Sequence, residues 1–253
     1  MKILNFMCCW NEIEYLPKCV KFYQQHGIDV VVADNHSDDG SWEWLNDNKV
    51  DCFQFDTDGM FSVKRQQTIR GQYVDTHREY DWIIYGDSDE YPATEANLID
   101  MFHKANDAGC NVIRMKSFEL HNTGEDRGEP TQTYFYYSER YTRHGGIERI
   151  HKNVDGFGYA GDFIRMKNGK KVATIQQGNY LNYGNTKTAE QREGVYQRRK
   201  KAWECGLEPR QHGAHYAKNR ERGFKWDKNS LKDMRQHSDW SFIKDKVVDF
   251  HEY

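Results

Sequence analysis

Short apolar runs alternate with amphipathic stretches through the first half of the chain, and this alternation constrains the fold more than any other feature. Runs rich in β-branched and aromatic residues predict strands at residues 3–9, 29–33, 50–55, 82–85 and 111–120. An apolar stripe at helical spacing predicts a helix at residues 12–26. Further helices are predicted at residues 41–48, at the long polar stretch 62–79 and at 94–108. Because strand–helix alternation of this kind builds a parallel sheet covered by helices, we expect an α/β fold with a mostly parallel, doubly wound sheet.

The second half of the chain has a different pattern. Residues 121–131 are polar and predict a loop, residues 133–149 are aromatic and β-prone, and residues 188–203 and 225–253 predict helices. No repeat and no Pro/Ser-rich linker separates this half from the first. We therefore expect a single domain over residues 1–253, with the second half packed on the first.

Composition excludes some classes of function. The 253 residues carry a formal net charge of -3, which does not suggest a nucleic-acid partner. No stretch approaches the roughly 18 apolar residues that a membrane span needs, and the opening apolar run reads as a strand rather than a signal peptide. Six cysteines are scattered without Cys-x-x-Cys spacing, so we expect reduced, structural thiols in a cytoplasmic protein.

An acidic cluster follows the fourth predicted strand. The apolar run that begins at Trp82 stops at Asp87, and Asp89 and Glu90 follow. Crowded carboxylates repel one another, and a divalent cation such as Mg²⁺ relieves that repulsion while keeping substrate phosphate in its shell. Ligands of open α/β sheets lie beyond the carboxyl ends of strands. The pattern allows two interpretations, a metal–diphosphate site at Asp87 and Asp89 or a solvated acidic turn.

A second polar cluster follows the second predicted strand. Asp34 ends that strand, and its carboxylate could accept a hydrogen bond from a base N–H or a ribose hydroxyl, or serve the turn. Asp38 and Asp39 are expected to serve the turn, and Ser41 is expected to be the N-cap of the following helix. After the first strand, Asn11 and Glu12 mark either a helix start or a nucleotide contact.

These motifs together resemble a known family. The sequences Cys-Trp-Asn-Glu at residues 9–12, Asp-Asn-x-Ser-x-Asp-Gly-Ser at 34–41, Lys-x-x-Gln at 64–67 and Asp-x-Asp-Glu at 87–90 are similar to those of family 2-type glycosyltransferases with a GT-A fold. The closest subgroup has a metal motif Asp-x-Asp-Glu-aromatic. The similarity covers residues 3–120 in order and spacing, and is loose at residues 150–152 and 180–184.

The resemblance implies a Rossmann-like GT-A domain that transfers sugar from a nucleotide-diphosphate-sugar donor to a hydroxyl acceptor such as a glycan. Residues 1–120 would bind the donor, and residues 121–253 would form an acceptor-side extension. The implied donor contacts are Asn11, Glu12, Asp34, Asp87, and Lys64 or Arg65 near the diphosphate. Asp87 and Asp89 would hold Mn²⁺ or Mg²⁺, which stabilises the diphosphate leaving group.

The chain departs from the subgroup in two places. Asn182-Tyr183 stands where the subgroup has a His-Tyr pair that completes the metal shell, so His215 or His212 is the alternative third ligand, if these are not ordinary surface histidines. No general base for the acceptor hydroxyl stands out. The candidates are Glu119, Glu125, Asp126 and Asp155.

Other functions remain open at this point. A sugar-phosphate nucleotidyltransferase also uses carboxylates at a sheet edge, but it normally has a Gly-rich basic loop after the first strand, where this chain has residues 8–12. A phosphohydrolase normally carries Asp-x-Asp after its first strand, and a degenerate glycan- or nucleotide-binding module is the non-enzymatic alternative. The basic run at residues 198–201 is either a solvated helix face or a peripheral contact with anionic membrane or a lipid-linked diphosphate.

Overall fold

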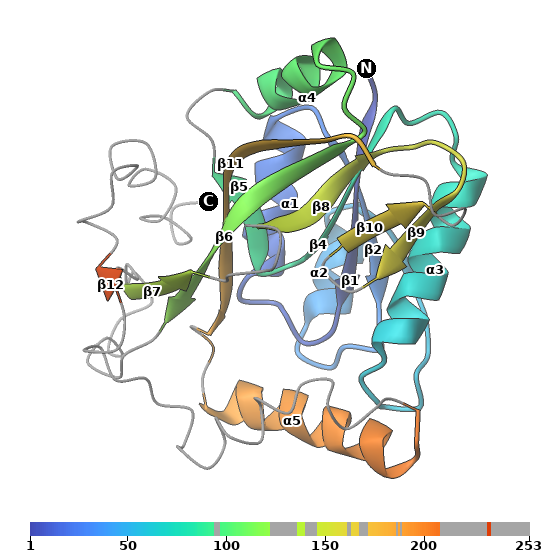
Figure 1. Cartoon of the computed structure of the whole chain (residues 1–253). Coiled ribbons are helices and arrows are strands. Elements are labelled where there is room, and N and C mark those ends of the chain that lie inside the picture. The colour runs from blue at the N-terminus through green and yellow to red at the C-terminus, as the bar shows by residue number, and fades with distance from the viewer. Residues whose placement is uncertain are drawn as a thin grey trace.

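The computed structural model of the chain (Figure 1) is built around one large mixed sheet. The structure describes residues 1–93, 97–121, 136–139, 146–160, 163–166, 172–185, 187, 189–207 and 232–233. Ten strands pair in the order β12-β7-β6-β8-β4-β1-β2-β3, with β11 beside both β5 and β6. The predicted α/β fold is confirmed.

The first half of the chain supplies the parallel part of the sheet. Its strands are β1 (Ile3–Cys9), β2 (Asp29–Asp34), β3 (Asp51–Gln54) and β4 (Trp82–Asp87). β1 lies between β2 and β4 and is parallel to both, and β3 is parallel to β2. All seven residues of β1 are buried, as expected for a central strand that is covered on both faces.

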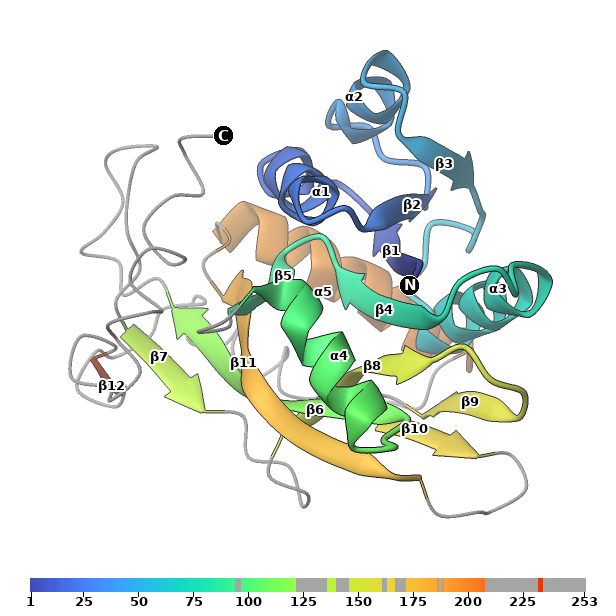
Figure 2. The ribbon, with the colours of Figure 1, turned by 90° about the horizontal axis from the view of Figure 1, so that it is seen from above.

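Helices connect these strands and cover both faces. The helices are α1 (Leu16–Gln25), α2 (Ser41–Asp47), α3 (Val63–Thr76) and α4 (Leu98–Asp107). Buried residues of α1, α2 and α4 pack with Ile3 and Met7 on one face, whereas Ile69 and Val74 of α3 pack with Phe6 on the other. Figure 2 shows α1 and α2 on one side of β1–β3 and α3 on the opposite side.

The remaining strands are mostly antiparallel to their neighbours. They are β5 (Glu90–Ala93), β6 (Val112–His121), β7 (Tyr136–Glu139), β8 (Ile147–Lys152), β11 (Thr174–Asn185) and β12 (Lys232–Asp233), with β9 (Phe157–Ala160) and β10 (Phe163–Met166) as a separate hairpin. β8 is antiparallel to both β4 and β6, β5 is antiparallel to β11, and β11 is parallel to β6.

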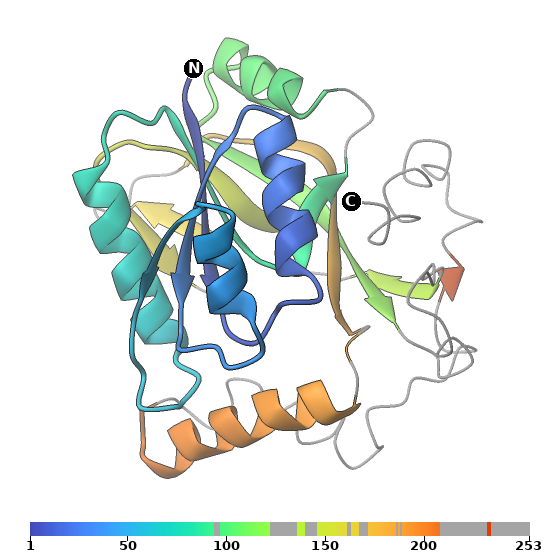
Figure 3. The same ribbon diagram turned by 180° about the vertical axis from the view of Figure 1, so that it is seen from behind.

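The last described helix, α5 (Ala189–Glu204), crosses the molecule at the edge where β1 and β2 end. It occupies this position in both of the opposed views (Figures 1 and 3). The hydrogen bond from the backbone N–H of Phe61 to the carbonyl oxygen of Arg198, 3.3 Å, fixes α5 beside the start of α3. Helix α5 therefore covers the edge of the sheet at which the parallel strands have their carboxyl ends.

Local expectations were mostly confirmed, with four differences, one of which is the unpredicted strand β5. The first helix begins at Leu16 rather than residue 12, because residues 11–13 are held by the loop that follows β2. The N-cap of α2 is Gly40, with φ of 96°, and not Ser41. The predicted C-terminal helix lies outside the described residues except at Lys232–Asp233, which form strand β12. All six cysteines are free, as predicted.

Candidate metal and nucleotide site

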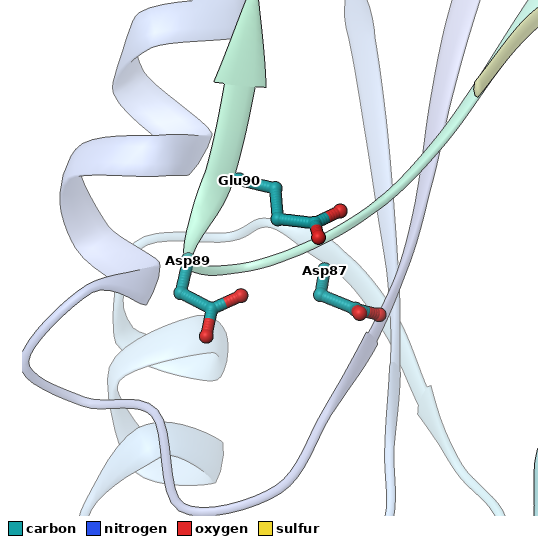
Figure 4. A group of neighbouring side chains, drawn as sticks. All are labelled: Asp87, Asp89 and Glu90. Carbon is teal, nitrogen blue, oxygen red and sulfur yellow. The ribbon is translucent and has the colours of Figure 1, made fainter. Parts of the chain in front are cut away.

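Three carboxylates gather where β4 ends. Asp87 is the last residue of β4, Glu90 is the first residue of β5, and Asp89 lies in the turn between them. One oxygen from each side chain lies within 4.8 Å of the others. Figure 4 shows the three side chains next to one another at this turn. The two acids of the predicted motif therefore lie together, and the structure adds Glu90 to them.

Strand β11 holds this acidic turn from outside the first half of the chain. Asn182 lies opposite Glu90 in the antiparallel β5–β11 pair, and the backbone N–H of Tyr183 donates to the carbonyl oxygen of Asp89 at 2.9 Å. Gly86, inside β4, is packed so closely that a Cβ there would lie 2.5 Å from the Oη of Tyr180. The turn is thus positioned by contacts nearly a hundred residues away in sequence.

The Glu90 carboxylate is bound by protein groups. Nη2 of Arg149, on β8, lies 3.2 Å from Oε2 of Glu90, and both side chains are largely buried. Nδ2 of Asn182 donates to Oε1 of the same carboxylate. One cation and one amide thus hold the Glu90 carboxylate and with it the turn beside the two aspartates.

Lys187 supplies a second cation to the cluster. Its Nζ lies 2.7 Å from Oδ2 of Asp89 and also donates to Oε1 of Glu12. Burial alone lowers the pKa of Lys187, but the carboxylates of Asp89 and Glu12 together raise that pKa well above its ordinary value. The ammonium therefore stays charged between the two acids.

Burial also affects Glu12, the acid that shares Lys187 with Asp89. The pKa of Glu12 is raised to about 8: desolvation is the largest cause, Lys187 lowers the pKa, and the charges of Asp89 and Asp87 add to the rise. The shift reflects the cost of burying a carboxylate beside other acids.

The Asp87 side chain has no ion pair and no hydrogen bond to any group in the described part of the chain. A half-buried carboxylate left in this state beside Asp89 has oxygens available for another ligand. Carboxylate oxygens at this spacing suit Mg²⁺ or Mn²⁺, which take hard oxygen ligands. The residues present therefore fit a divalent cation.

The loops after β1 and β2 are joined by their polar side chains. Both oxygens of the buried Asp34 carboxylate accept from Ser37, from its N–H at 3.0 Å and from its Oγ at 2.6 Å. Ser37 Oγ in turn accepts from the backbone N–H of Asn11 at 2.8 Å. Asn11 has φ of 54°, and its side chain exchanges hydrogen bonds with Asp38. Asp34 and Asn11 thus have structural partners at the predicted nucleotide edge.

Helix α5 places an arginine over this same edge. The guanidinium carbon of Arg198 lies 3.9 Å from the ring centroid of Trp10, and Nη2 donates to the carbonyl oxygen of Met60 at 2.9 Å. Nη2 also lies 3.4 Å from Oγ1 of Thr57. Arg198 and Arg199 of the basic run pack on the protein, the latter over Phe61, whereas Lys200 and Lys201 are exposed.

The other predicted site residues lie in different places. Lys64 and Arg65 are exposed on the first turn of α3, and Lys64 lines a cavity of about 370 Å³ between α3 and His151, Asn153 and Phe157. Asp155 is 96% exposed and pairs with Arg78, near the start of β4, so it lies at the opposite end of that strand from Asp87. Glu125, Asp126, His212 and His215 lie outside the described residues.

Three residues of the site were not predicted, namely Arg149, Asn182 and Lys187. In the sequence, Asn182 stands out only as a departure from the subgroup's histidine. Lys187 follows it by five residues in a polar stretch without a motif, and Arg149 lies in a β-prone run. Only the pairing of β5 with β11, and of β8 with β4, brings these residues to the acidic turn.

Within the part of the chain that the structure describes, no helix is long and apolar enough to cross a membrane.

The sequence matches no protein-family model, and no curated protein matches it. Among solved structures, the fold is distantly similar to glucosyl-3-phosphoglycerate synthase from Mycobacterium tuberculosis in complex with Mn²⁺, UDP and glucosyl-3-phosphoglycerate. That match has 12% identity and a TM-score of 0.30, and covers 47% of this chain and 44% of the synthase, so the match spans less than half of the synthase's length.

Two nucleotidyl-transferring proteins give similar scores over more of the chain. A putative glucose-1-phosphate thymidylyltransferase from Bacillus anthracis has 7% identity and a TM-score of 0.37, covering 79% of this chain and 95% of its own. A UDP-glucose pyrophosphorylase complexed with UDP-glucose has 10% identity and a TM-score of 0.36, covering 81% and 99%. At such scores the likeness is distant and does not assign a function.

Proposed function

We propose that this protein is a metal-dependent glycosyltransferase that moves a sugar from a nucleotide-diphosphate-sugar donor to a hydroxyl acceptor, in keeping with the family that its first-half motifs resemble. The observation that carries the proposal is the cluster of Asp87, Asp89 and Glu90 at the carboxyl end of β4, with their oxygens within 4.8 Å. Lys187 bridges Asp89 to Glu12. Two of the motifs that resemble the family, at residues 87–90 and 9–12, therefore meet at this site.

Asp87 and Asp89 are the residues that would hold the metal. Asp87 has a carboxylate without a partner in the described structure, and one oxygen of Asp89 lies within 4.8 Å of one of its oxygens. When bound there, Mn²⁺ or Mg²⁺ supplies positive charge that stabilises the diphosphate released from the donor. Glu90 supports them from its ion pair with Arg149.

Among the acids considered as general base, Glu119 fits this site best. It lies on β6 in register with Asn182 of β11, and Asn182 lies opposite Glu90 on β5. Residues in register on neighbouring strands share a face, so Glu119 lies on the face of Glu90, one strand beyond Asn182. We infer that Glu119 removes the proton of the acceptor hydroxyl. Asp155, at the far end of β4, is not part of this proposal.

The test is a panel of nucleotide-diphosphate sugars with Mn²⁺ and mixed hydroxyl acceptors, with released nucleoside diphosphate as the readout. The proposal predicts release from at least one donor, and loss of release on chelation or in Asp89→Ala. Glu119→Gln should slow transfer while leaving metal-dependent nucleotide binding unchanged. Pyrophosphate release from a nucleoside triphosphate and a sugar phosphate, with no reaction of any nucleotide sugar, would instead identify a nucleotidyltransferase.

A further inference from the structure

The ammonium of Lys187 lies inside the acidic cluster. Its Nζ is 2.7 Å from Oδ2 of Asp89 and donates to Glu12, and the three side chains are 9–13% exposed. Its charge also lies 5.7 Å from the ring centroid of Tyr15. Lys187 is therefore a buried cation held by two carboxylates, rather than a surface lysine resting on an acidic patch.

This position conflicts with a metal bound to the same acids. One oxygen of Asp89 lies within 4.8 Å of one oxygen each of Asp87 and Glu90, so a cation shared by these acids would lie close to the Lys187 ammonium. Like charges a few ångströms apart in a site shielded from water repel strongly. The Lys187–Asp89 ion pair and a metal on Asp89 thus compete for one carboxylate.

We propose that Lys187 is the resident cation of the acidic cluster, and that a divalent cation binds by exchange with its ammonium. The inference rests on the proposed function, because it takes Asp87 and Asp89 as the metal ligands. In the absence of metal, Lys187 balances the charge of Asp89, donates a hydrogen bond to Glu12 and keeps the turn in place. When metal occupies the aspartates, the ammonium leaves Asp89 by rotation of its flexible four-carbon chain.

The first test compares the affinity for Mn²⁺ alone, measured by electron paramagnetic resonance of free Mn²⁺, among the wild type, Asp89→Ala and three lysine variants. Lys187→Met keeps the length of the side chain but removes the competing charge, so it should bind Mn²⁺ at least about tenfold more tightly than the wild type, which is about 1.4 kcal/mol. Lys187→Arg keeps the charge and should gain nothing. Lys200→Met removes an exposed charge of α5 and should match the wild type.

A second test uses the wild-type protein, so it does not depend on the folding of a variant. Lysine acetylation is followed at each residue by mass spectrometry, with and without saturating Mn²⁺. The buried ion pair should protect Lys187 without metal, and Mn²⁺ should increase its labelling several-fold, whereas labelling of the exposed Lys200 should not change.

The outcomes separate this inference from the proposed function. If Lys187→Met and the wild type bind Mn²⁺ equally, and Asp89→Ala binds none, exchange is wrong and the metal site stands. If Lys187→Met does not fold, unchanged labelling of Lys187 at saturating Mn²⁺ overturns exchange. If neither the wild type nor Lys187→Met binds Mn²⁺, with or without a nucleoside diphosphate, the metal site itself is overturned.

Discussion

The parallel strands of the first half and strand β11 of the second half bring residues to the same site by two different routes. In the first half, the residues follow directly after a strand, as Glu12 follows β1, Asp34 ends β2 and Asp87 ends β4. In the second half, Lys187 reaches Glu12 across 175 residues of sequence, through the pairing of β11 with β5 and β6.

The two halves of the chain contribute different kinds of residue to the site. The first half contributes most of the acids, and the second half contributes the groups that neutralise or position them, namely Arg149, Asn182 and Lys187. Carboxylates crowded at the end of one strand are unfavourable until partners arrive. We therefore expect the acidic turn to depend on the second half for its geometry and on the first half for its chemistry.

The strongest test of this dependence is at the contact between β4 and β11. Gly86→Ala would place a Cβ 2.5 Å from the Oη of the fully buried Tyr180, and we expect a loss of about 3 kcal/mol in the free energy of unfolding by overpacking. Urea denaturation measures the change.

Two variants control this measurement. Tyr180→Phe removes the hydroxyl that clashes, so the double variant with Gly86→Ala should recover part of the loss. Gly71→Ala, on α3 with open space around its Cβ, should be neutral or slightly stabilising. A Gly86→Ala protein as stable as the Gly71→Ala protein would show that the two strands are not packed as described.

A pH dependence tests β8, the strand through which Arg149 reaches the site. Burial lowers the pKa of His151 to about 4, and the hydrogen bond from its Nδ1 to the carbonyl oxygen of Lys152 opposes this shift. The unfolded chain binds the proton near pH 6.5 while the folded protein stays neutral, so stability falls as pH drops from about 6.5 toward 4. Between pH 7 and pH 5 we expect a loss of about 2 kcal/mol from this residue.

Urea denaturation of the wild type and His151→Gln at pH 7 and pH 5 checks the sign and the size. The variant should lose about 2 kcal/mol less than the wild type over this interval. Equal acid dependence in both proteins would mean that His151 titrates normally and that β8 is open to solvent at this point.

The predicted nucleotide contact at the end of β2 is tested by Asp34→Ala. We expect nucleoside diphosphate binding to weaken by about 1.5 kcal/mol if the carboxylate accepts a donor of the nucleotide. Ser37→Ala removes both of the bonds that the Ser37 hydroxyl makes, to Asp34 and to Asn11, but keeps the carboxylate. An equal loss of affinity in the two variants, measured by calorimetry, would assign Asp34 to the turn alone.

The smallest expected effect on stability concerns the N-cap of α3 in the first half of the chain. Ser62 caps α3 by accepting from the backbone N–H of Arg65 at 3.1 Å, so Ser62→Ala should cost about 1 kcal/mol of stability. Ser62→Asn, which can also cap, should retain most of it. Equal losses in thermal denaturation would show that the serine acts through packing rather than through the cap.

The same division explains what could be predicted from the sequence. Strands β1, β2 and β4 were predicted because each is a short apolar run bounded by polar turn residues, and Ser62 marks the start of α3. The residues that complete the site carry no such signal. No pattern in the sequence distinguishes Lys187 from the other lysines. It reaches Asp89 only through the pairing of β11 with β5, which depends on packing between distant segments.

Failures within the first half have a local cause. Ser41 looked like an N-cap, but its Oγ accepts from the backbone N–H of Glu12 at 3.0 Å, and Gly40 takes the cap position with a left-handed backbone. The spacing of residues along the chain cannot show whether the Ser41 hydroxyl caps its own helix or accepts from the loop after β1. Strand β5 was missed because four residues directly after a tight acidic turn show no periodic pattern.

The central claim is that Asp89 and its neighbours form a metal site for a nucleoside diphosphate. Calorimetry of the protein with a panel of nucleoside diphosphates, with and without Mn²⁺, measures this directly, alongside Asp89→Ala and the surface control Asp47→Asn. We expect one nucleoside diphosphate to bind only with Mn²⁺, binding to be lost in Asp89→Ala with the fold intact, and Asp47→Asn to match the wild type. Metal-independent binding of the nucleotide, or unchanged affinity in Asp89→Ala, would contradict the claim.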